Sequence, residues 1–166
     1  MVLSLDDVRQ ISGFDQFDRN FESDKPTTDD NAVPACRPLT DQGVAFGDRW
    51  TEFRAVSDDG DLDVGGQLDL MAVAGQVVAV YPNEAAARAV FDQRIAAVEE
   101  CVKLQIPYYD PVISNPDANT AVFHADGWSS ATIVKSTVVV EASVVALPEA
   151  ERVASEMART MADQVS

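Results

Sequence analysis

The sequence is poor in basic residues, in histidine and in cysteine. Its 12 lysines and arginines are outnumbered by 28 acidic residues, which gives a net charge of −16 at pH 7. A phosphate backbone or an anionic bilayer attracts a basic surface and is repelled by an acidic one. The composition therefore excludes nucleic acid, or a membrane held by electrostatics, as a partner. A cation, a polycation or an oligobasic ligand remains compatible with it.

Long apolar runs are missing as well. The longest nearly apolar stretch, 70–81, contains Gly75 and Gln76 and is roughly half the ~20 residues that a membrane helix needs. Residues 1–10 contain neither a basic cluster nor an apolar segment, so we expect no signal peptide in this chain. With 166 residues, 46% of them hydrophobic, the chain is long enough to form one domain, 1–166, with a substantial core.

Thiols and imidazoles are too few for a zinc site. Cys36 and Cys101 are the only cysteines and His124 is the single histidine, whereas a structural zinc needs four such ligands at short spacing. We therefore expect no bound metal. From the residues alone, three interpretations of the cysteines remain open: a disulfide, two unrelated buried thiols, or a nucleophile with a base. A disulfide would stabilise the chain by roughly 4 kcal/mol in the chain-entropy model.

Two motifs approach known sites and fail on spacing. In the Asp-rich segment 58–65, an EF-hand register places Val64 where glycine is required and Leu70 where the bidentate glutamate is required, so we expect a solvated turn. The segment Gly127–Ala131 is one residue short of a Gly-x-Ser-x-Gly nucleophile elbow, and a strand rather than a helix follows it. His124, the only available base, is expected to be structural or exposed.

No glycine-rich phosphate loop or dinucleotide-binding motif occurs in the chain, so nucleotide binding has no support in the sequence. We expect no cofactor and no enzymatic activity. Four aromatic residues with polar groups, Trp50, Tyr108, Tyr109 and Trp128, are candidates for lining a ligand pocket. The alternative is that they close the rim of the core.

Periodicity and capping residues predict an α+β fold. Ser4 and Asp7 predict the start of an N-terminal helix, Asn83 precedes a long amphipathic helix that extends to residue 102, and Pro148 opens a closing helix. Loops are expected at 22–38 and 57–66. Strands are expected at 50–56, 76–81, 119–125, 131–134 and 137–145. The short connections between strands favour an antiparallel sheet packed by the N-terminal, central and C-terminal helices, with a groove.

One combination of segments is distinctive. Residues 76–101 contain a Val-rich strand that ends in tyrosine, a Pro-Asn turn, and an alanine-rich helix that carries Phe91 and is followed by Cys101. The opening helix 3–13, the hairpin 127–141 and the helix from Pro148 accompany it. With these segments the chain resembles, over nearly its whole length, the PknH-like extracellular sensor domains, which are found behind actinobacterial serine/threonine kinases and in related lipoproteins.

The resemblance implies an exported, oxidised, non-catalytic domain with a groove and a disulfide between Cys36 and Cys101. Two features depart from the family pattern. A second disulfide that many members carry is absent, because its positions are occupied by Ser130 and by Val144 or Val145. A tryptophan that often precedes the helix cysteine is replaced by Val98. The chain thus represents a divergent branch, and the ligand of another member does not transfer to it.

The function that follows is an extracytoplasmic sensor or ligand-binding domain, tethered to a membrane kinase or a lipid anchor by a segment outside this chain. Its expected partner is a small molecule or a cell-envelope ligand. The alternative is a free lipoprotein module that binds another envelope protein. A pocket of more than a few hundred Å³ favours the first function, and a flat apolar patch favours the second.

Overall fold

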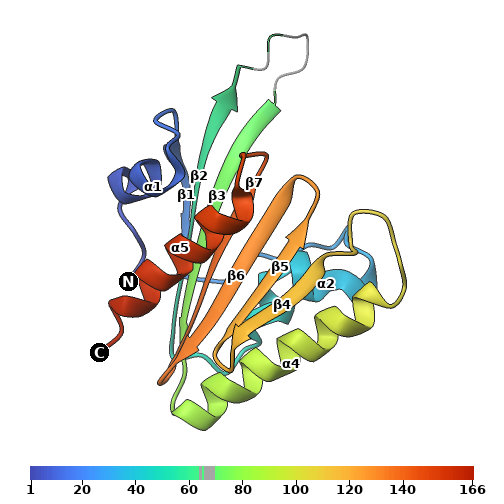
Figure 1. The fold of residues 1–166 in the computed structure, drawn as a ribbon. Coiled ribbons are helices and arrows are strands. Elements are labelled where there is room, and N and C mark those ends of the chain that lie inside the picture. The colour runs from blue at the N-terminus through green and yellow to red at the C-terminus, as the bar shows by residue number, and fades with distance from the viewer. Residues whose placement is uncertain (64, 66–69) are drawn as a thin grey trace.

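The computed structural model describes residues 1–63, 65 and 70–166 (Figure 1). The helical elements are α1 (Leu5–Ser12), the short 3-10 helix η1 (Pro34–Cys36), α2 (Arg37–Thr40), α3 (Gln42–Phe46), α4 (Glu84–Val102) and α5 (Ala150–Asp163). The strands are β1 (Asp18–Ser23), β2 (Glu52–Leu62), β3 (Leu70–Val80), β4 (Val112–Asp117), β5 (Thr120–Ala125), β6 (Trp128–Lys135) and β7 (Val138–Val145).

The strands form one antiparallel sheet in the order β1-β2-β3-β7-β6-β5-β4. β2 and β3 pair antiparallel, hairpins connect β4 through β7, and α4 carries the chain from β3 to the opposite edge of the sheet (Figure 1). β7 pairs with β3 and thereby joins β1-β2-β3 and β6-β5-β4 into one sheet. The predicted α+β class with an antiparallel sheet is confirmed.

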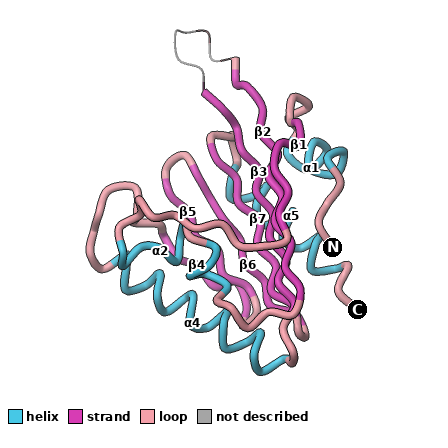
Figure 2. The backbone as a smooth tube through the Cα atoms, turned by 180° about the vertical axis from the view of Figure 1, so that it is seen from behind, coloured by secondary structure: helices cyan, strands magenta, loops and turns pink. Residues whose placement is uncertain are grey.

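Helices cover both faces of this sheet. α1 and α5 pack on one face, and α4 packs with α2 and α3 on the other (Figures 1 and 2). Side chains alternate between the faces of a strand, so β7 places Val140 and Ala142 in the α5 core and Val139 in the α4 core. Apolar residues on both faces of the central strands therefore build two cores separated by the sheet.

The helices with clear capping residues form as predicted. Ser4 and Asp7 make a reciprocal capping box at the start of α1, and Gly13 ends that helix in the left-handed conformation. The Asn83 side chain accepts a hydrogen bond from the backbone of Ala86 and caps α4. α5 begins two residues after Pro148, and it buries Val153, Met157 and Met161, while Val165 is buried just beyond its end.

The prediction of a loop over 57–66 is wrong for 57–62, because β2 continues to Leu62; Val64 and Gly66 lie outside the described residues. Asp58 is fully buried rather than solvated, and its carboxylate accepts hydrogen bonds from Arg19 of β1 at 2.8 and 3.1 Å. The guanidinium group compensates the cost of burying this charge within a strand. The prediction of a loop over 22–38 is wrong at both ends, because β1 extends to Ser23 and the short helices η1 and α2 begin at Pro34 and Arg37.

A candidate ligand-binding cavity

A cavity of about 530 Å³ opens on the α4 face of the sheet. Its walls are the α2–α3 segment on one side and the chain that follows α4 on the other, and its floor is made by α4, β6 and β7. The lining residues are Leu39, Thr40, Asp41, Gln42, Ala45, Phe46, Arg94, Tyr108, Tyr109, Trp128, Ser129, Ser130, Glu141, Ser143 and Val145. The lining thus combines aromatic rings, hydroxyl groups, two carboxylates and one guanidinium group.

The hollow arises where small residues share one register row across the sheet. Gly75 of β3 lies opposite Ser143 of β7, which in turn lies opposite Ser130 of β6. A Cβ atom at Gly75 would stand 2.5 Å from the Ser143 Oγ, so a larger residue here would force that hydroxyl to turn away from its present position. Large side chains would fill this row in an ordinary sheet–helix interface. Here the row leaves space between the sheet and α2–α3.

A buried ion pair occupies the floor of the cavity. Arg94 of α4 and Glu141 of β7 form a salt bridge, with their side chains only 3% and 12% exposed. The Arg94 Nη1 also donates to Thr132 Oγ1 at 2.9 Å, and Thr132 donates to Glu141 Oε2 at 3.1 Å. Because Thr132 lies opposite Glu141 in the β6–β7 register, the sheet itself holds this network in place.

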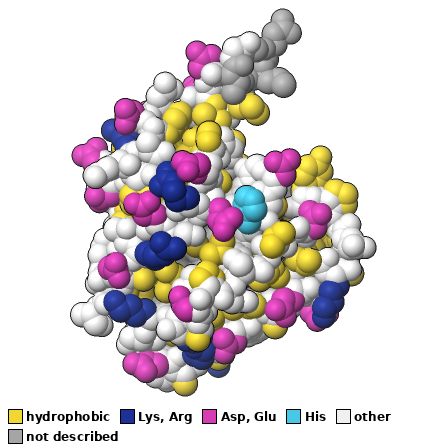
Figure 3. Space-filling view, in the orientation of Figure 1, with side chains coloured by type: hydrophobic (Ala, Val, Ile, Leu, Met, Phe, Trp, Pro, Cys, Tyr) yellow, Lys and Arg dark blue, Asp and Glu magenta, His cyan; other side chains and the backbone are white. Residues whose placement is uncertain are grey.

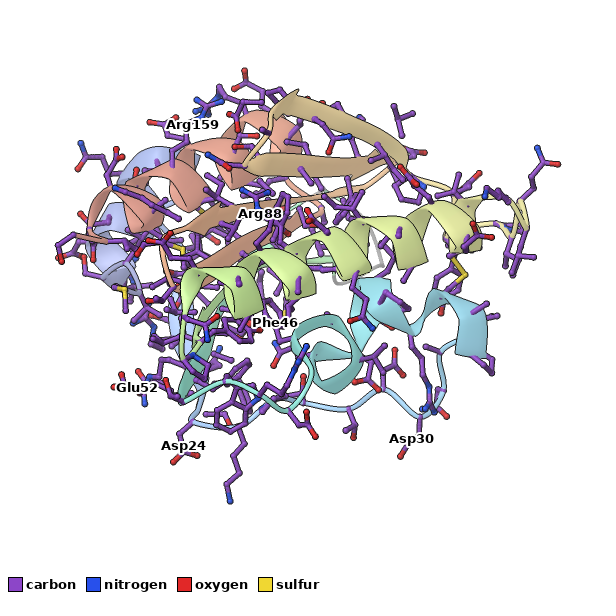
Figure 4. All side chains as sticks on the ribbon, turned by 90° about the horizontal axis from the view of Figure 1, so that it is seen from below. Asp24, Asp30, Phe46, Glu52, Arg88 and Arg159 are labelled. Carbon is purple, nitrogen blue, oxygen red and sulfur yellow. A yellow bond between two sulfur atoms is a disulfide. The ribbon has the colours of Figure 1, made fainter. Side chains whose placement is uncertain are left out.

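Aromatic rings and a backbone carbonyl surround the Arg94 guanidinium. It lies 5.3 Å from the ring centre of Phe46 and 5.6 Å from that of Phe123. Its Nε donates to the Pro38 carbonyl at 3.3 Å, at the start of the α2–α3 wall. Figure 4 shows Phe46 beside α4, where α3 meets the helix. Arg94 therefore links the sheet, α4 and the cavity wall.

A disulfide fixes both walls to each other. Cys36 and Cys101 are bonded, with their Cα atoms 4.9 Å apart. α2 begins at the residue after Cys36, and the opposite wall follows Cys101, whose Sγ lies 3.4 Å from the Tyr109 carbonyl oxygen. The disulfide therefore joins the residues just before the two chain segments that form the cavity walls.

Three of the four predicted aromatic residues meet at this cavity. Tyr108, Tyr109 and Trp128 line it, and Tyr108 is 86% exposed at the surface. Trp50 lies elsewhere: it packs against Phe53 with ring centres 5.5 Å apart, and its Nε1 donates to the Gly47 carbonyl at 3.0 Å. The structure thus places Trp50 at the rim of the core and the other three at the cavity.

Comparison with known proteins identifies the family. The family model described as the PknH-like extracellular domain matches residues 1–164. The chain belongs to the PknH-like extracellular domain family. The crystal structure of the extracellular domain of PknH from Mycobacterium tuberculosis has the same fold: its TM-score is 0.71 at 17% identity, and the match covers 99% of this chain and 92% of that chain. No curated protein matches the sequence. The family is extracellular, as the resemblance implied.

The histidine of this PknH-like domain has a serine partner but not the geometry of a hydrolase. Its Nδ1 lies 2.6 Å from Ser129 Oγ and 3.8 Å from Glu151 Oε2 (Figure 3, where His124 is the one histidine drawn). In a catalytic triad the serine and the carboxylate meet different ring nitrogens. Here both meet the same one, and Ser129 is fully buried. The contact therefore fits a structural link between β5, β6 and α5.

Sequence reasoning missed the polar residues of the cavity floor. Arg94 occupies a position on the buried stripe of α4, between Phe91 and Val98, where a charge is unexpected. Glu141 likewise interrupts the apolar run of β7. A charged residue at a core position signals a buried partner, so these two could have been paired before the structure was known. The hydroxyls of Ser130 and Ser143 carry no such signal.

Within the described ranges no three His, Cys, Asp or Glu side chains come close enough together to hold a metal ion. None of the helices described has the length and apolarity needed to cross a membrane.

Tyr81 anchors the α3 end of the cavity wall and makes stability sensitive to alkaline pH. Its hydroxyl donates to the Phe46 carbonyl at 2.8 Å, and burial raises its pKa above the ordinary value. Above about pH 10 the unfolded chain releases this proton while the folded chain retains it, so we expect the free energy of unfolding to fall as pH rises. Urea unfolding between about pH 9 and 11 measures the slope.

The Tyr81→Phe variant is the control for this slope. It should lose about 1 kcal/mol near neutral pH, because the Phe46 carbonyl loses its donor, and it should show a shallower alkaline decline. Tyr108 and Tyr109 are present in both proteins, so the difference between the two slopes reports Tyr81. Identical slopes would contradict the prediction.

Proposed function

We propose that residues 1–166 form a single, non-catalytic sensor domain that binds a small molecule in the α4-face cavity. A segment outside this chain would tether the domain to a membrane kinase or a lipid anchor. The observation that carries this proposal is the cavity itself. Its volume of about 530 Å³ lies within the range of about 300–1,000 Å³ that small-molecule sites occupy, and it combines apolar walls with a few convergent polar groups.

The construction of the walls supports binding without large rearrangement. The disulfide fixes the origin of both walls, and Arg94 ties one of them to the sheet. A preformed site loses little conformational entropy when it binds a ligand. Both chain ends lie beside α1 and α5, on the side of the sheet away from α4 (Figures 1 and 2), so a tether at either end leaves the cavity free.

A cavity-filling variant tests the proposal. Ser130 is 5% exposed and lines the floor, so Ser130→Leu places an isobutyl group in the space that a ligand would occupy. A fragment screen is monitored through the amide NMR signals of the domain. The native protein should bind fragments that shift the amide signals of Ser143 and Trp128. Ser130→Leu should weaken that binding by at least about tenfold, equivalent to about 1.4 kcal/mol.

Ser155→Leu is the matched control. Ser155 lies on α5, on the other face of the sheet, and the same substitution there should leave fragment affinity unchanged. Both variants should keep the amide spectrum of a folded protein. Fragment binding that is equal in the native protein and in Ser130→Leu would place the binding site elsewhere and contradict the proposal.

One observation favours the second function, an interaction module for another envelope protein. Leu104, Tyr108 and Val112 are 52%, 86% and 70% exposed, and they lie four residues apart in the stretch from the end of α4 to the first residue of the edge strand β4. Exposed apolar side chains of this size are typical of contact surfaces. The cavity beside them is the stronger signal, so we rank this function second.

A further inference from the structure

We propose that the ligand of this cavity is a small organic cation: an ammonium group on an apolar body. This inference rests on the proposed ligand-binding function and adds the chemical class of the ligand. Three features of the cavity carry it: a carboxylate oxygen with no partner among the described residues, an arginine with several compensating contacts, and aromatic rings in the lining.

The free acceptor belongs to Glu141. Its Oε2 receives the Arg94 salt bridge and the Thr132 hydroxyl, while its Oε1 has no hydrogen-bond partner among the described residues. That atom is also accessible to solvent. Among the described residues, the side-chain polar atoms that are fully buried and lack a partner belong only to Arg37 and Gln76, so Oε1 is not fully buried. Glu141 lines the cavity, so Oε1 is available to a donor that enters it.

The Arg94 charge, by contrast, is compensated several times. Besides Glu141 and Thr132, the guanidinium faces the rings of Phe46 and Phe123 and donates to the Pro38 carbonyl. The faces of aromatic rings are negative and attract a cation. Arg94 therefore has polar and aromatic partners besides Glu141, whereas the described contacts of the Glu141 carboxylate all fall on its Oε2.

The remaining charges of the lining have the same sign as Glu141. Asp41 is 3% exposed, and its two oxygens accept from the backbone amides of Val44 and Asp29, at 3.0 and 3.1 Å. It offers no free acceptor but adds a negative charge to the wall. With two acids and one base in the lining and a net charge of −16 for the chain, the cavity attracts cations and repels anions.

The lining also offers aromatic surfaces that suit such a ligand. Tyr108, Tyr109 and Trp128 line the cavity together with the aliphatic side chain of Val145. Aromatic rings bind ammonium groups through their negative faces and apolar groups through their surface area. The hydroxyls of Ser130 and Ser143 add two acceptors near Glu141. Neither hydroxyl has a hydrogen-bond partner among the described residues.

A charge series on the native, oxidised domain tests the inference. Three probes share a phenyl ring and differ in their polar end: 2-phenylethylamine is a cation, 2-phenylethanol is neutral and phenylacetate is an anion. Titrations at low salt and pH 7 follow the amide signals of Ser130, Ser143 and Trp128. We expect the amine to bind at least about tenfold more tightly than the anion, and its affinity to fall as salt is added.

Glu141→Gln removes the charge while keeping an oxygen that can accept from Arg94 and Thr132. The affinity of 2-phenylethylamine should then fall to nearly that of 2-phenylethanol. Glu149→Gln, which removes one charge from an exposed residue at the start of α5, should leave the advantage unchanged. If Glu141→Gln does not fold, Trp128→Leu serves instead: it keeps apolar area, removes an aromatic face, and should weaken the amine more than the alcohol.

The outcomes separate the two proposals. An anion or alcohol that binds as tightly as the amine would overturn the cationic ligand and leave the ligand-binding function standing, with Arg94 as the group that receives an anion. If none of the three probes shifts the cavity signals of the folded protein, both proposals fail. A preference for the amine that persists in full in Glu141→Gln and in Trp128→Leu would also overturn the inference.

Discussion

Replacing both cysteines with serine is expected to lower the free energy of unfolding by about 4 kcal/mol. The bond between Cys36 and Cys101 joins residues 65 positions apart, and a crosslink over that distance removes much of the conformational freedom of the unfolded chain. For a domain of this size the loss corresponds to a fall in Tm of about 8–16 °C. Urea unfolding of Cys36→Ser/Cys101→Ser against the oxidised native protein measures it.

The loss should also be uneven across the structure. The α2–α3 segment is held to α4 by the disulfide and by Arg94, whereas β3 and β7 are paired with neighbours on both sides. Amide exchange should therefore accelerate more in Arg37–Phe46 than in the central strands. Reduced native protein is the matched control and should resemble the double variant. A stability loss below about 1 kcal/mol in both would contradict this account.

Local signals explain which elements were predictable from the sequence. α1 and α4 are preceded by residues whose side chains accept hydrogen bonds from backbone amides in the first turn of the helix. The strands β5, β6 and β7 are separated by short turns. Each of these signals lies within a few residues of the element it defines. The family resemblance added the pairing of Cys36 with Cys101, which the residues alone left open.

Elements that depend on distant partners were not predictable. β1 has no alternating pattern, and it pairs with β2 where Arg19 also binds the buried Asp58. The α2–α3 segment consists of two helices of 4 and 5 residues, too short for a periodic pattern, and packing against α4 holds it. Strand β4 contains Pro116, and a proline within a segment is a signal against a strand. It is tolerated here because β4 lies at the edge of the sheet.

The same distinction applies to the cavity. Residue type alone selected Tyr108, Tyr109 and Trp128, because aromatic residues with polar groups are frequent in binding sites. The hollow itself depends on the register that places Gly75, Ser143 and Ser130 in one row, and register across three strands is set by the whole sheet. The cavity therefore became visible only once the strands were paired.

Replacing Arg94 with methionine is expected to lower the free energy of unfolding by about 3–5 kcal/mol. Methionine fills much of the space beside Phe46 and Phe123, so the main loss is electrostatic. The Glu141 carboxylate would remain beside the sheet without its counter-charge, and removing one partner of a buried ion pair leaves the other uncompensated. Urea unfolding at neutral pH measures the change.

A double-mutant cycle separates the ion pair from the packing around it. Glu141→Leu alone should also be strongly destabilising, because it leaves the guanidinium without its anion. The double variant Arg94→Met/Glu141→Leu buries no charge at this position, so it should be more stable than the sum of the two single losses predicts. Losses that simply add would show that Arg94 stabilises the fold through the Pro38 carbonyl and the aromatic rings alone. A positive coupling would instead show that Glu141 holds Arg94, and with it the α2–α3 wall, in place.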